Sequence, residues 1–267
     1  MQINKVLGAV VLALGAAAVQ AATVYDSLGP AVGNLPSLGY QATQTAEFGD
    51  RIALGGTARG LDSVTIRMSS WALASTYGSQ AAGYNHDLTL NVYGAGSGAF
   101  AGSLLGSVTL DAFIPWRPEA SDSCTNGRWS DGAGNCFSGK AFDVTFDFGS
   151  LGLVLPDSVV VGLAFNTQSW GAQPIGIDGP YDSLNFGLAS GAPTIGTDVN
   201  PDGVFWNTAT AGNLSNPANV NLFAEDTNWT GYVPAIAVDA HDVPEPASLA
   251  LVGVALAGVG FARRRKA

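Results

Sequence analysis

The sequence contains few cationic residues and is acidic as a whole. Only 11 of its 267 residues are Lys or Arg, and five of these lie near the two ends. Residues 22–246 hold six basic and 21 acidic residues, a net charge of −15. Because a phosphate backbone requires a cationic face, this balance argues against nucleic acid as a partner. An acidic surface suits solubility outside the cell and the binding of divalent cations.

Histidine is also scarce, which limits the catalytic chemistry available. His86 lies at the start of a predicted strand beside Asp87, which suggests a capping or turn role, and His241 lies in a predicted linker. The sequence has no Gly-x-Ser-x-Gly elbow and no His pair with metal-ligand spacing. Two carboxylates suffice for a glycoside hydrolase, so that activity stays open. We nevertheless expect a noncatalytic protein.

The N-terminus has the order of features found in a secretory signal peptide. Lys5 supplies positive charge, residues 6–19 are uncharged and mostly apolar, and Val19 and Ala21 are small residues at the −3 and −1 positions of a cleavage site. The apolar run is short for a permanent span of the hydrocarbon core. Residues 1–21 are therefore predicted to be a signal peptide.

The C-terminus combines three features in a fixed order. Pro244, Glu245 and Pro246 are followed by residues 247–262, which carry no charge, and then by a basic tail over residues 263–267. Its cations are Arg263, Arg264, Arg265 and Lys266. The prolines prevent the helix from extending backwards, and the cations favour the cytoplasmic side. We predict a linker over 239–246 and a transmembrane helix over 247–262.

This terminus closely resembles the PEP-CTERM sorting signal. The resemblance implies that an exosortase, a membrane protease-transferase, removes the tail near Pro244–Pro246 after a stage of membrane anchoring. An ordinary C-terminal anchor would explain the helix and the cations but not the tripeptide. The resemblance covers only about the last 25 residues, so it predicts the route of the protein and not the activity of its body.

The body, residues 22–238, shows period-two alternation and no sustained helical stripe. The alternation is clearest in five segments: residues 64–68, 88–92, 142–148, 159–165 and 184–188. Shorter candidate strands are residues 23–25, 52–54, 107–110, 204–206 and 235–238. Apolar faces that alternate with polar ones are typical of antiparallel sheets covered on one side. We predict an all-β fold, a two-sheet antiparallel sandwich of jelly-roll type.

The body also loosely resembles the choice-of-anchor β-sandwich domains carried by many PEP-CTERM proteins. The resemblance rests on residues 24–30, 61–64 and 155–167. It supports the sandwich and implies no catalytic residues. Residues 208–221, rich in Asn, Ala, Thr and Pro, are predicted to form a long loop.

Two local features suggest structural roles. Cys124 and Cys136, the only cysteines, are expected to form a disulfide because the protein is exported. Asp198, Asn200 and Asp202 match the first half of a Ca²⁺ loop, with Asp178 or Asp182 available to complete the shell. The twelfth position of that loop is Ala209 rather than Glu, so a plain turn is the favoured alternative.

Three of the six tryptophans lie in predicted loops or at strand ends: Trp116, Trp129 and Trp170. Exposed aromatic rings beside acidic residues can stack on sugars, and Trp129 with Asp131 is the best such candidate. The alternative is that the rings close the ends of the core.

We expect a noncatalytic sandwich associated with extracellular polysaccharide. Its rivals are a carbohydrate-binding module and a secreted glycoside hydrolase.

Overall fold

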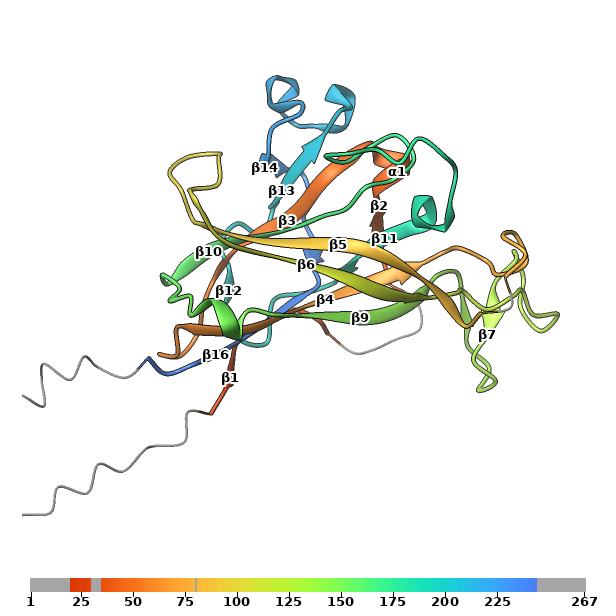
Figure 1. Ribbon diagram of the computed structural model, residues 1–267, viewed down its shortest axis with the longest axis horizontal. Coiled ribbons are helices and arrows are strands. Elements are labelled where there is room, and N and C mark those ends of the chain that lie inside the picture. The colour runs from red at the N-terminus through yellow and green to blue at the C-terminus, as the bar shows by residue number, and fades with distance from the viewer. Residues whose placement is uncertain (1–19, 30–34, 80, 244–267) are drawn as a thin grey trace, which may run out of the picture.

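The alternating segments of the sequence form the strands of two facing antiparallel sheets (Figure 1). The computed structural model describes residues 20–29, 35–79 and 81–243. The first sheet has the order β1 (Ala22–Asp26), β16 (Ile236–His241), β4 (Gly60–Ser70), β11 (Leu184–Ala189) and β15 (Val233–Pro234), with β2 (Ser37–Gly39) on β11 and β9 (Lys140–Asp147) on β4. All ten predicted segments overlap strands of the two sheets.

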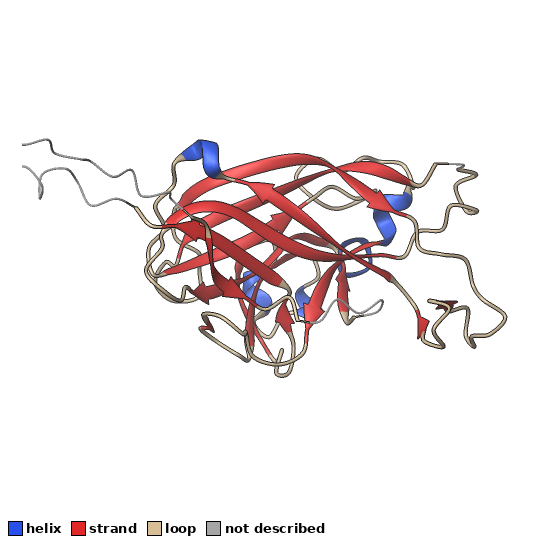
Figure 2. Cartoon of the chain, turned by 90° about the horizontal axis from the view of Figure 1, so that it is seen from below, coloured by secondary structure: helices blue, strands red, loops and turns tan. Residues whose placement is uncertain are grey.

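The second sheet has the order β14 (Ala224–Thr227), β13 (Gly203–Thr208), β3 (Thr45–Ala53), β10 (Ser158–Ala164), β5 (Gly83–Gly94) and β6 (Leu104–Pro115), with β12 (Thr197–Asp198) on β3. A small hairpin of β7 (Trp129–Ser130) and β8 (Cys136–Phe137) stands apart. The helical turns are α1 (Tyr40–Thr43), η1 (Gly149–Leu151), η2 (Pro180–Ser183), η3 (Ala211–Asn213) and η4 (Pro217–Asn219). They lie in the connections between strands (Figure 2).

The core lies between the inner faces of the two sheets. In β4, Val64, Ile66 and Met68 are buried, and in β3, on the other sheet, Phe48 and Ile52 are buried in the same cluster. Alternation along a strand sends every second side chain inward, which is why period two in the sequence predicts these positions. Burial of apolar surface between the sheets is the main stabilising contribution.

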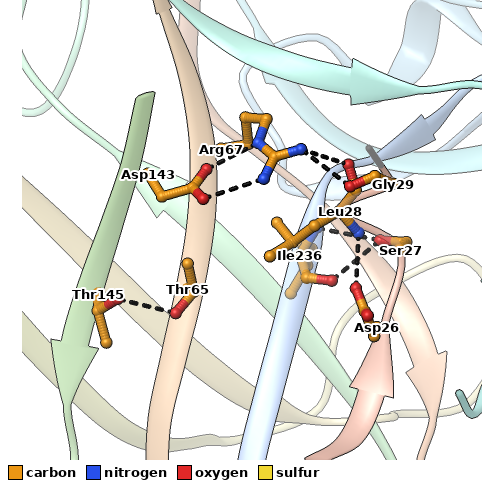
Figure 3. Close-up of polar contacts among 9 residues, drawn as sticks. All are labelled: Asp26, Ser27, Leu28, Gly29, Thr65, Arg67, Asp143, Thr145 and Ile236. Atoms are coloured by element: carbon orange, nitrogen blue, oxygen red, sulfur yellow. Dashed lines mark hydrogen bonds and ion pairs between the residues drawn. The ribbon is translucent and has the colours of Figure 1, made fainter. Parts of the chain in front are cut away.

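The first strand of the domain is held against the rest of its sheet by polar contacts (Figure 3). The Ser27 hydroxyl donates to the Ile236 carbonyl and accepts from the Ile236 amide, at 3.1 and 3.0 Å. The buried Arg67 guanidinium donates to both carboxylate oxygens of Asp143, at 2.7 and 3.0 Å, and to the carbonyls of Leu28 and Gly29, at 2.9 and 3.1 Å. Arg67 therefore joins the segment after β1 to β4 and β9.

The sheet extends further towards the C-terminus than the sequence predicts. The predicted domain ends at residue 238, with a linker from 239, but β16 continues to His241, which pairs with Gly60. Its ring nitrogen Nδ1 lies 2.7 Å from Oδ1 of Asp62. The predicted boundary was wrong because Asp239 and His241 are polar, and their partners on neighbouring strands are visible only in the register.

The structure also bears on the predicted loop and on the ends of the chain. The predicted loop over 208–221 contains the short 3₁₀ turns η3 and η4. Among residues 20–29, 35–79 and 81–243, no helix has the length and apolar character needed to cross a membrane. Most of the predicted signal peptide, the Pro-Glu-Pro motif, the predicted transmembrane helix and the basic tail lie outside the described residues.

Candidate functional site

The predicted disulfide is confirmed. Cys124 and Cys136 are bonded, with their α-carbons 5.7 Å apart. The bond closes the segment between β6 and β9 and holds the β7–β8 hairpin, in which Ser130 pairs with Cys136. Its position in an irregular connection is consistent with a structural role.

Trp129 is not the exposed ring that a sugar platform requires. It is only 6% exposed, and its ring lies 4.9 Å from that of Phe137 and under the Lys140 ammonium. Its indole nitrogen donates to the Gly139 carbonyl at 2.9 Å. A sugar platform at Trp129 would need an exposed ring, and the disulfide-closed hairpin buries it. Asp131 is fully exposed, and hydrogen bonds from Asn135 and nearby amides lower its pKa, as in a turn cap.

Trp116 has the more open surroundings. Its half-buried ring stacks near Tyr77, with centroids 5.9 Å apart, and lies 4.9 Å from Tyr84. Burial and the nearby charge of Asp178 raise the pKa of Tyr77, so that phenol stays neutral. This cluster of Tyr77, Tyr84 and Trp116 (the aromatic cluster) offers flat apolar surface beside an acidic group, the combination that recognises sugar rings. Trp170 is half-buried in another connection.

The residues of the predicted calcium loop do not converge on one point. Asp198 accepts from the Asn200 amide at 2.9 Å, Asn200 donates to Glu225, and Asp202 accepts from the Thr230 hydroxyl. In the described part of the chain, no group of three or more His, Cys, Asp or Glu is placed to hold a metal ion. Asp182, offered as an extra ligand, instead accepts from the amides of Gln168 and Gly179. The segment is organised as a turn.

Asp198 is nevertheless unusual, because its side chain turns towards the interior. It pairs with Ile52 in the β12–β3 ladder, and Asp50 lies two residues along β3 on the same face. Asp50 is 2% exposed and Asp198 5%. Burial, together with the charge of Asp198, holds the pKa of Asp50 well above its usual range, and burial also raises the pKa of Asp198. We call Asp50 and Asp198 the interior acid pair.

A cavity adjoins Asp198 of the interior acid pair. It has a volume of about 460 Å³ and is bounded by the segments 191–201 and 230–233. Asp198 lines it together with Thr197, Pro201 and Tyr232, and most of its wall is formed by small or apolar residues. Asp50 was not predicted as a site residue, because an Asp between Gly49 and Arg51 is typical of an exposed position. The only signal available was its spacing of two from the apolar Phe48 and Ile52.

His86 lies inside β5 and not at its start, so its predicted capping role was wrong. Its ring is buried, and Nε2 lies 2.8 Å from the carbonyl oxygen of Asn166. Burial lowers the pKa of His86 below its usual value, and the ring stacks on Tyr181. The ring is therefore held as a neutral group within the packing of the domain.

Comparison with known proteins concerns the end of the chain. Residues 242–266 match the family model described as the PEP-CTERM protein-sorting motif. The chain carries a PEP-CTERM sorting signal. Neither the curated proteins nor the solved structures contain a match to the chain.

The PEP-CTERM signal begins where the sandwich ends. The last residue of β16 is His241, and the match starts at residue 242. β1 runs beside β16, with Ala22 opposite Ala240, so the first and last strands of the domain are neighbours in one sheet (Figure 1). The signal implies export, a membrane-anchored stage and processing by an exosortase.

Proposed function

We propose that the protein is an exosortase-sorted component of the cell surface or extracellular matrix, whose noncatalytic sandwich of jelly-roll type associates with extracellular polysaccharide. In this proposal residues 1–21 are removed as a signal peptide, and residues 247–262 span the inner membrane until the exosortase acts. The match of residues 242–266 to the PEP-CTERM motif is the observation that carries the proposal.

The positions of the strands support this order of events. β1 begins at Ala22, directly after the predicted cleavage site, and β16 ends at His241, directly before the motif. Removing both ends would therefore leave every described strand intact. The strongly acidic body suits a soluble domain outside the cell.

The proposal of a noncatalytic sandwich rests on how its titratable groups are used. The ring of His86 is bonded to a backbone carbonyl, and that of His241 contacts Asp62. Neither histidine is paired with a hydroxyl or thiol that it could activate as a nucleophile, within the described residues. Turnover of a soluble glycan by the purified protein would contradict this part of the proposal.

Mass spectrometry of the protein recovered from the surface of its native host tests the sorting. The expected form begins at residue 22 and lacks everything after Pro246. Glu245→Ala should leave a membrane-retained precursor, whereas the matched control Glu119→Ala, at an exposed loop position, should be processed normally. Intact Arg263–Lys266 on the surface form would refute the proposal.

A carbohydrate-binding module is the second candidate, and the aromatic cluster favours it. Its partly open rings lie in nearly parallel planes, with 17° between Tyr77 and Trp116. Glycan-array binding should then depend on Trp116, with Trp116→Ala losing most of the signal and Trp170→Ala keeping it. Equal binding by the two variants would remove the aromatic cluster from consideration.

A further inference from the structure

Three buried oxygen atoms without hydrogen-bond partners belong to side chains that lie between the two sheets, and one of these side chains lines the cavity. They are Oδ2 of Asp50, Oδ2 of Asp198 and the hydroxyl of Tyr25. Tyr25 is completely buried, and its ring packs against Gly196, two residues before Asp198. Burial and the nearby charges of Asp50 and Asp198 raise the pKa of Tyr25. Unpaired buried polar atoms are rare in folded proteins and costly, so three together require an explanation.

The backbone satisfies only half of each carboxyl group. Oδ1 of Asp50 accepts from the Arg51 amide at 2.8 Å, and Oδ1 of Asp198 accepts from the Asn200 amide at 2.9 Å. The nearest cation in sequence, Arg51, points to the outer face, with its guanidinium 5.0 Å from the ring centre of Phe205. None of the ion pairs among the described residues includes Asp50 or Asp198. Among the described residues, the interior acid pair thus has two buried oxygens and no ion-pair partner.

We propose that Asp50 and Asp198 bind one calcium ion inside the sandwich, next to the cavity that Asp198 lines. Diagonal neighbours on adjacent strands have α-carbons about 7–8 Å apart, close enough for two short carboxylates to hold one ion between them. An ion about 2.3–2.6 Å from each oxygen spans about 5 Å between the two oxygens, which matches that arrangement. The donors are all oxygens, which favours calcium over softer transition metals.

The rest of the coordination shell comes from water and the phenol. Calcium takes six to eight oxygen ligands, and two carboxylates supply at most four. The cavity of about 460 Å³ gives water and the ion a route to Asp198. The neutral Tyr25 hydroxyl is a further oxygen beside the pair. Magnesium fits less well, because it requires a tighter octahedral shell and gives up its waters reluctantly.

This site differs from the loop predicted from the sequence. Both include Asp198, but the loop needs Asn200 and Asp202, whereas the interior site needs Asp50 on another strand. Asp202 is already occupied by the Thr230 hydroxyl. Substitution of Asp50 and of Asp202 therefore separates the two sites. The proposal does not depend on exosortase sorting.

The test uses the exported protein purified from its host and stripped with a chelator. Calorimetric titration with CaCl₂ should show one site per chain, and calcium at a hundredfold excess over its Kd should raise the Tm by roughly 5–10 °C. Magnesium should give a much smaller shift. Asp50→Asn and Asp198→Asn should each abolish the calcium shift. Asp202→Asn and the exposed, equally charged control Asp87→Asn should keep it.

Several results would overturn the proposal. The first is an equal Tm of the wild-type protein in calcium and in chelator. If, in addition, Asp50→Asn is more stable than the wild type at neutral pH, the two carboxyl groups share a proton instead of binding an ion. Loss of the shift in Asp202→Asn but not in Asp50→Asn would place the ion in the loop. If Asp50→Asn does not fold, Asp198→Asn at the cavity wall and the wild-type titration decide the question.

Discussion

Replacing Arg67 with Met tests how the N-terminal segment is held to the domain. The Arg67 side chain is 6% exposed, and its guanidinium makes four of the hydrogen bonds described above, two to Asp143 and two to the carbonyls of Leu28 and Gly29 (Figure 3). Methionine keeps much of the apolar stem of Arg67 but removes every donor. The variant therefore isolates the polar contacts from the packing of the side chain.

The structure divides the expected loss into two unequal parts. The Asp143 side chain is 41% exposed, so water can replace its lost partner, and that half of the interaction is worth about 0–1 kcal/mol. The two carbonyls are partly buried and lose bonds from a charged donor, at about 1–2 kcal/mol together. We expect Arg67→Met to lower the free energy of unfolding by about 1–3 kcal/mol, and Asp143→Ala by about 1 kcal/mol or less.

Thermal and urea unfolding of both variants measure these differences, and hydrogen exchange locates them. The Tm of Arg67→Met should fall by about 2–12 °C. Amide protection should decrease first over residues 22–28, because Arg67 ties the segment after β1 to its sheet. Thr65→Val, which removes the exposed Thr65–Thr145 hydroxyl contact on the same strand, is the control and should change little. A loss below 1 kcal/mol in Arg67→Met, or protection lost evenly over the whole domain, would refute this reasoning.

Three further predictions concern single groups. Burial raises the pKa of Glu47, and hydrogen bonds from Asn91 and Tyr93 act in the opposite direction. Protonated Glu47 therefore makes its full contribution to stability below the unfolded-state pKa of about 4.3. That contribution is lost as the pH rises through the higher pKa of the folded state. Glu47→Gln should be more stable than wild type at pH 7 and lose that advantage near pH 4 in urea titrations; a pH-independent difference would contradict the assignment. Thiol labelling of the native protein should find no free cysteine, and the double Cys→Ser variant should lose up to about 3 kcal/mol. Trp129→Ala should speed proteolysis within residues 116–139 without altering glycan binding, since its ring is packed inside that segment; reduced binding with unchanged proteolysis would return it to a sugar site.

Strand positions could be predicted because most inward residues are apolar. Leu88, Leu90 and Val92 alternate with polar residues, and β5 is where that pattern places it. The predicted strand over residues 52–54 is shorter than β3, because Asp50 interrupts the apolar face formed by Phe48 and Ile52, although Asp50 lies in the middle of a paired strand. Local alternation cannot show which strands become neighbours, and those neighbours determine whether a charged side chain is buried.

The candidate site also depends on which strands are neighbours in the fold. Asp198 was found through its turn sequence, but its partner Asp50 is 148 positions away and is brought to it only by the β12–β3 register. The surroundings of Trp129 could not be read from the sequence for a related reason. The loop composition around it is polar, but the disulfide and the short β7–β8 pairing fold that loop onto the ring. Composition describes a segment in isolation, and burial is a property of its contacts.

The position of β16 between two partners has a mechanical consequence. A force applied to the C-terminal end of the domain acts first on His241 and is directed along β16. This strand is hydrogen-bonded to β4 on one side and to β1 on the other. Hydrogen bonds in an antiparallel ladder lie across the strand direction, so this load shears both ladders together instead of opening one bond at a time. A domain fixed by this end would resist drag from flowing medium until both ladders yield, and β1, although it comes first in the folded chain, would carry part of the force.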